Sequence, residues 1–143
     1  MIDINTGHIV VNFEIKLGPD IDFEVTNSFN IDKSITDFKN GYKWIHFENL
    51  KVNELYLNVN VCFHNEKTKM ITFVVSETEF KAKRWENWSE QEEMEKIAVY
   101  ENWLTTIVGV RREFNWGKIS IDYDIKGGRT TISILYNKQK SKK

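Results

Sequence analysis

A capped helix followed by a two-strand hairpin occupies the last third of the sequence, and each needs the other to bury its apolar face. Ser89 and Glu92 form a capping box, in which the Ser hydroxyl accepts from the third helical amide and the Glu side chain returns to the cap. The pattern predicts a helix over residues 89–108, with Gly109 as its C-terminal stop. The apolar residues gather within about a third of the helical wheel. They are Met94, Ile97, Tyr100, Leu104, Ile107 and Val108.

The hairpin comprises two alternating segments, residues 116–124 and 129–136, on either side of the turn 125–128. Their pairing predicts that one set of apolar residues faces another. The sets are Ile119, Ile121 and Tyr123, and Ile132, Ile134 and Tyr136. A helix packed on an antiparallel hairpin is typical of the α+β class.

Further strand signals precede the helix. Residues 9–17 and 54–64 alternate between apolar and polar side chains, and residues 42–47 are rich in aromatics and isoleucine. Another alternating strand is expected around residues 71–75. The spacing of apolar residues over 21–40 fits both a helix and a strand, and we favour a short helix or an irregular turn there.

Each of these strands has one apolar face and one mixed face, which is typical of an antiparallel sheet covered on one side only. We therefore expect a single α+β domain over residues 1–143. It would contain one antiparallel sheet of five or six strands, with the helix 89–108 packed on one face. The lysine-rich tail over 137–143 is expected to fray.

Composition excludes several classes of function. The net charge of −1 and the pI near 6.3 argue against a nucleic-acid partner, which favours a basic face. A single cysteine allows no internal disulfide. No apolar run approaches the roughly 18 residues of a membrane span, and no signal-peptide pattern opens the chain. We therefore expect a soluble cytoplasmic protein, without a membrane association or a cofactor.

Cys62 and His64 are one candidate catalytic pair. They lie two residues apart on the strand predicted over 54–64, so both point to its more polar face. A thiolate nucleophile requires a neighbouring base or positive charge. Cysteine is also among the most buried residue types, and a structural role is the alternative interpretation.

Asp122 and Asp124 are a second candidate pair, because two carboxylates on one strand face could perform acid–base hydrolysis. They also fit a solvated strand that leads into a turn. An acidic run, Glu90 to Glu95, opens the predicted helix, where it complements the positive end of the helix dipole. The three histidines are scattered and show no metal-ligand spacing, so we predict no metal site.

Arg84, Trp85 and Trp88 are the candidate partner-binding residues. They stand in a charged connector where burial is not assured, and exposed Trp and Arg are the residue types that anchor protein interfaces. The alternative is that both rings close over the start of the helix.

Two motif groups resemble a group of small bacterial proteins of uncharacterised function. One runs from Trp85 to Glu90 into a helix with Trp103-Leu104. The other is the Trp116-Gly117 pair, with Tyr123-Asp124 before a glycine turn. The resemblance covers roughly residues 85–136, implies a bacterial cytoplasmic protein, and carries no catalytic residues.

The residues favour a non-enzymatic module that binds a protein, and an immunity-type role against a toxin would fit. The alternatives are a small enzyme and a small-molecule-binding protein that uses the polar sheet face. Exposed edge strands would also permit a homo-oligomer.

Overall fold

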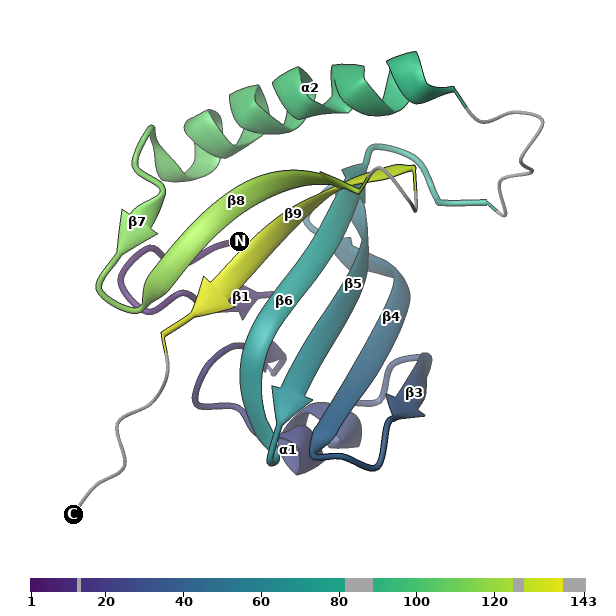
Figure 1. Cartoon of the computed structure of the whole chain (residues 1–143), viewed down its shortest axis with the longest axis vertical. Helices are drawn as coiled ribbons and strands as arrows, with labels where there is room; N and C mark the ends of the chain where they lie inside the picture. Colours follow the sequence, from purple (N-terminus) through teal and green to yellow (C-terminus); the bar gives the residue numbers. More distant parts are fainter. Residues whose placement is uncertain (13, 82–88, 125–127, 138–143) are drawn as a thin grey trace.

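The computed structural model describes residues 1–12, 14–81, 89–124 and 128–137. In Figure 1, the long helix α2 lies along one part of a twisted sheet, and the N-terminal segment passes behind that sheet. The elements in chain order are β1 (Ile9–Val10), β2 (Lys16–Leu17), α1 (Phe23–Ser28), β3 (Lys33–Asp37), β4 (Tyr42–Val52), β5 (Leu55–His64), β6 (Lys67–Ser76), α2 (Glu90–Val108), β7 (Glu113–Phe114), β8 (Gly117–Asp124) and β9 (Arg129–Tyr136).

Within the described residues, the main sheet is antiparallel and has seven strands in the order β3-β4-β5-β6-β9-β8-β7. The α+β class is therefore confirmed, whereas the expected five or six strands is an undercount. The short edge strands β3 and β7 account for the difference. Neither has a long alternating pattern, because an edge strand contributes little to the core.

The single strand expected over residues 9–17 is wrong: this segment forms the small β1–β2 hairpin. Ile9 pairs with Leu17, and both side chains are buried. The Asn12 side chain closes the turn, since its Oδ1 accepts from the amides of Glu14 and Ile15 at 2.8 and 3.0 Å. Ile9 and Leu17 lie on the same side both in one continuous strand and in a hairpin, so the alternation does not reveal the turn between them.

The predicted strand ends at Phe47 because a bulge interrupts the alternation after that residue. Strand β4 continues for five more residues, to Val52. The register with β5 shifts between Phe47 and Leu50, and Asn49 in the bulge has a φ of 50°. The Asn49 side-chain amide binds the backbone of Phe80, donating to its carbonyl at 3.1 Å and accepting from its amide at 2.7 Å. The chain that leaves β6 is thereby attached to the bulge.

Helix α2 begins and ends as predicted, with the Ser89 side chain accepting from the Glu92 amide and Gly109 as C-cap. Its inner face matches the predicted one at Tyr100, Leu104 and Val108, which are buried, but differs from it elsewhere. Met94 is 50% exposed and Ile107 is 36% exposed, whereas Glu93 is only 3% exposed. The inward position of Glu93 therefore sets which face of α2 meets the sheet.

Glu93 faces inward because strand β9 supplies polar partners for it. The Thr130 amide donates to Glu93 Oε1 at 3.2 Å, and the Thr130 hydroxyl donates to the Glu93 carbonyl oxygen at 2.5 Å. The other carboxylate oxygen, Oε2, forms an ion pair with the Lys96 ammonium. That contact lies outside hydrogen-bond geometry, so Oε2 has charge compensation without a directed hydrogen bond.

The apolar face of the sheet is covered by two separate segments. Trp103 of α2 packs edge-on against Phe73 of β6, with ring centroids 6.1 Å apart. Phe23 of α1 packs edge-on against Phe63 of β5 at 5.4 Å. The opposite face carries the mixed side chains, and no described element covers it in Figure 1.

The last strand also holds the start of the chain. The Tyr136 hydroxyl donates to the Gly7 carbonyl at 2.6 Å, and Trp116 Nε1 donates to the Ile4 carbonyl at 2.8 Å. The Trp116 ring lies directly over Gly7, where an added Cβ would be 2.6 Å from the ring. Residues 1–7 are therefore fixed by contacts to β9 and to the residue before β8.

We predict that Gly117→Ala is much more destabilising than Gly109→Ala. A Cβ on Gly117 would lie 2.1 Å from the Leu135 carbonyl oxygen, whereas a Cβ on Gly109 has nothing within 4 Å. Both residues have a positive φ, 154° and 82°, which only glycine adopts readily, so alanine costs roughly 1–3 kcal/mol at either from backbone strain. In urea unfolding, Gly117→Ala should lower the free energy of unfolding by more than Gly109→Ala does. Equal decreases for the two variants would contradict the close approach of β8 and β9.

We also predict an alkaline stability effect of Tyr136. Burial raises the pKa of this phenol, so the folded state resists ionisation while the unfolded chain ionises near pH 10. Its contribution to the free energy of unfolding is complete below that pH and is lost as the pH rises further. Tyr136→Phe should lose about 1 kcal/mol at pH 8 and show a shallower decline towards pH 11. Parallel pH profiles for the two proteins would contradict this.

Candidate binding face

A row of polar residues crosses the uncovered face of the sheet. Cross-strand partners in register form this row: Ser34, His46, Asn60, Thr72, Ser133 and Ser120. Asn60 Oδ1 lies 2.6 Å from His46 Nδ1, and Asn60 Nδ2 donates to Thr72 Oγ1 at 3.4 Å. The Thr36 hydroxyl lies 3.1 Å from His46 Nε2. The row therefore links β3, β4, β5 and β6 through side chains.

The partners of His46 determine the tautomer of its neutral ring. Asn60 Oδ1 only accepts hydrogen bonds, so Nδ1 must carry the proton. Nε2 then accepts from the Thr36 hydroxyl. The ring is thereby held in one orientation on the sheet surface.

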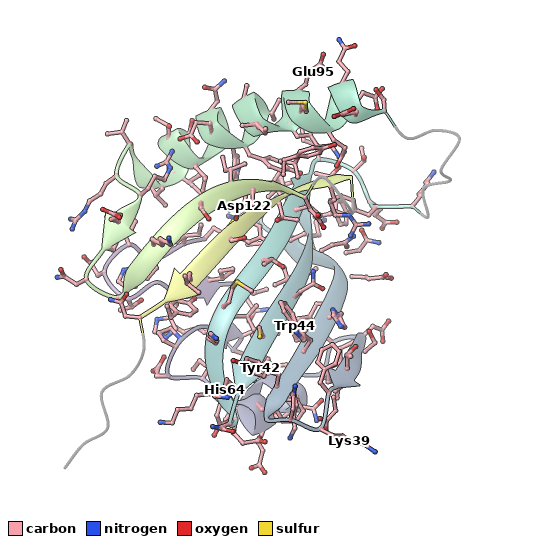
Figure 2. All side chains as sticks on the ribbon, in the orientation of Figure 1. Lys39, Tyr42, Trp44, His64, Glu95 and Asp122 are labelled. Atoms are coloured by element: carbon pink, nitrogen blue, oxygen red, sulfur yellow. The ribbon has the colours of Figure 1, made fainter. Side chains whose placement is uncertain are left out.

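Four rings form an aromatic patch that adjoins this row and shares His46 with it: Tyr42, Trp44, His46 and His64. Tyr42 and His64 stack with centroids 4.3 Å apart, and Trp44 lies parallel to His46 at 6.3 Å. Figure 2 shows Tyr42, Trp44 and His64 together on the exposed side of β4 and β5. The rings are partly or fully exposed, so the patch presents both apolar surface and polar ring atoms to solvent.

Lys69 adds a positive charge to the aromatic patch. The register between β5 and β6 shifts here, because Cys62 pairs with Met70 and Phe63 pairs with Thr68. Lys69 is the extra residue of this bulge. Its ammonium donates to the Tyr42 hydroxyl at 3.2 Å and lies 5.1 Å from the centre of that ring.

Cys62 and His64 point to the same face, as predicted, but their surroundings differ. The Cys62 side chain is 4% exposed, and burial raises the pKa of its thiol, partly opposed by Lys69. The His64 ring is exposed and stacks on Tyr42. This environment favours the neutral thiol, whereas nucleophilic catalysis requires the thiolate.

Asp122 and Asp124 lie on β8 and are exposed. The Ser120 hydroxyl donates to Asp122 Oδ2 at 3.0 Å. Figure 2 places Asp122 near α2, far along the sheet from Tyr42 and Trp44. The structure therefore does not bring this pair together with Cys62 and His64.

Arg84, Trp85 and Trp88 lie outside the described residues, as do residues 138–143 of the predicted tail. Within the described part of the chain, no group of three or more His, Cys, Asp and Glu residues is arranged to hold a metal ion. No helix in the same part is both long and apolar enough to span a membrane.

Sequence reasoning identified Cys62 and His64 but missed the residues that surround them. Tyr42, Trp44 and His46 alternate along one strand, which is a signal for a shared face. Their contacts with Asn60 and His64 depend on how β4 pairs with β5, and spacing along the chain does not specify that register.

Comparison with protein families, with curated proteins and with solved structures found no match to this chain. The resemblance of residues 85–136 to a group of small bacterial proteins therefore stays a prediction.

We predict that Cys62 reacts slowly with a thiol reagent such as Ellman's reagent. At pH 8 the native protein should react at least about tenfold more slowly than the same protein in guanidinium chloride, because burial limits both access and ionisation. A native rate equal to or above the unfolded rate would reveal an activated thiol and would favour the enzyme hypothesis.

Proposed function

We propose that this protein is a non-enzymatic binding module that captures a protein partner on the uncovered face of its sheet. The aromatic patch is the observation that carries the proposal. Trp44 is the proposed anchor, and Lys69 is the proposed contact for an acidic group of the partner. An immunity-type role is one form of this proposal, in which the partner is a toxin protein.

The composition of the patch supports a protein interface. Aromatic side chains are enriched at the centres of interfaces because they bury a large area at a low cost in conformational entropy. Trp44 and Tyr42 are half-buried beside each other, and the Lys69 ammonium is fixed against Tyr42. A partner would therefore meet rings and a charge that are already oriented.

The polar row supports the same proposal, because it reduces the cost of binding. Hydrogen bonds with Thr36 and Asn60 orient His46, and Asn60 also donates to Thr72. Side chains that are already ordered lose less conformational entropy on association. The row thus provides a rigid surface next to the rings.

A planar small molecule is the second candidate ligand for this face. The stacked rings of half-buried Tyr42 and exposed His64, together with the Lys69 cation, suit an anionic aromatic compound. A thermal-shift screen with such metabolites would reveal binding as stabilisation that increases with ligand concentration.

The experiment is affinity capture with four baits: the wild type, Trp44→Ala, the double variant Trp85→Ala with Trp88→Ala, and Val99→Ala. Val99 is the control because it is 61% exposed on α2, away from the patch. Trp44→Ala should weaken the captured complex by about 30-fold or more, as expected for a central aromatic anchor. Val99→Ala should bind like the wild type.

Three other results would contradict the proposal. A partner lost only with the Trp85/Trp88 variant would move the interface from the sheet to the connector. Equal binding by all four baits would exclude both surfaces. No stoichiometric partner for a folded wild type would favour the small-molecule candidate, which the thermal-shift screen addresses.

A further inference from the structure

Strand β3 is an edge of the main sheet, and no described strand pairs with its outer side. The Phe38 amide donates to the Tyr42 carbonyl of β4 at 3.1 Å. Hydrogen bonding alternates along an antiparallel strand, so Thr36 and Ser34 also direct their backbone groups to β4. Lys33, Ile35 and Asp37 therefore direct theirs away from the sheet, towards solvent.

We propose that two copies of this chain associate through their β3 strands, antiparallel and with Ile35 opposite the partner's Ile35. This inference is independent of the proposed function. The pairing is two-fold symmetric, so the same contacts occur twice, and it joins the two main sheets edge to edge.

Charge complementarity along β3 selects this register. When Ile35 faces its own copy, Lys33 lies opposite the partner's Asp37, and Asp37 lies opposite the partner's Lys33. Both charge pairs are between opposite signs, and opposite charges directly across a pair of strands attract. Shifting the register by two residues in either direction loses both charge pairs and shortens the ladder.

Exposed apolar surface at the same edge supports a second copy as the occupant. Ile35 pairs with Ile45, which is fully buried, yet Ile35 itself is 46% exposed. The apolar core thus reaches this edge and stops in solvent. The partner's Ile35 would cover it, and the core would continue across the two-fold axis.

Local contacts hold the two charged side chains at the ends of β3. Lys33 Nζ donates to the Phe29 carbonyl at 2.9 Å, and Asp37 Oδ1 accepts from the Lys39 amide at 2.8 Å. Charged residues on an edge commonly prevent strand pairing. Here a positive charge, Lys33, precedes Ile35 and a negative charge, Asp37, follows it at the same distance. This arrangement favours pairing of the strand with its own copy in one register and disfavours other registers.

The test exchanges the charges at Lys33 and Asp37 and measures the monomer–dimer equilibrium of each variant. Sedimentation is recorded over a series of protein concentrations at low salt. The wild type should show a concentration-dependent monomer–dimer equilibrium. Lys33→Glu and Asp37→Lys each place like charges opposite one another twice, and each should weaken dimerisation by about tenfold or more. The double variant K33E/D37K restores opposite charges and should recover most of the wild-type affinity.

Lys39→Glu is the matched control, because it makes the same charge change as Lys33→Glu in the exposed turn after β3. It should dimerise like the wild type. A wild type that stays monomeric at every concentration would overturn the proposal, as would a dimer that none of the β3 substitutions weakens. Failure of the double variant to recover would overturn the register. None of these results depends on Trp44, so they leave the partner-capture experiment unaffected.

Discussion

The apolar face of the main sheet is the constraint on which the other elements depend. The interior strand β5 buries Leu57, Val59, Val61 and Phe63 on this face, and one helix cannot cover so many strands. Helix α2 covers the region around β6, β8 and β9, and the N-terminal hairpin with α1 covers the remainder. Both covering segments lie on one side, and no described segment covers the other face, which carries the polar row and the aromatic patch. In the proposed function, stability and recognition would use opposite faces of the same strands.

The buried carboxylate of Glu93 explains why the predicted inner face of the helix is right at Tyr100 and Leu104 but wrong near the start of the helix, at Met94. A wheel ranks residues by hydrophobicity and assigns Met94 inward and Glu93 outward. The actual rotation follows from Thr130, which lies on β9 and supplies two hydrogen bonds to Glu93. Hydrogen bonds and the Lys96 ion pair offset the cost of removing the carboxylate from water. Such compensation depends on a tertiary partner 37 residues away, and no local pattern records it.

Much of the fold was predictable where burial is one-sided and regular. The alternation of β5 and β9, the cap at Ser89 and the stop at Gly109 each follow from a local rule. The rest depended on exceptions to alternation: the turn at Asn12 and the bulge at Asn49. The candidate site was only partly predictable, because the sequence indicates a mixed face on β5 but not which residues of β4 and β6 stand beside it. Cross-strand register assembles the patch, so its members become visible only in three dimensions.

The contacts between Tyr136 and Gly7 join residues 129 positions apart and have a consequence for synthesis on the ribosome. The N-terminal hairpin and α1 precede the strands of the main sheet, but the hydrogen bond that fixes Gly7 forms only once β9 has been made. During translation, the part of the apolar face that α2 covers is exposed until α2 has been made. Non-local pairing of this kind delays folding and leaves strand edges free to aggregate while the chain is incomplete.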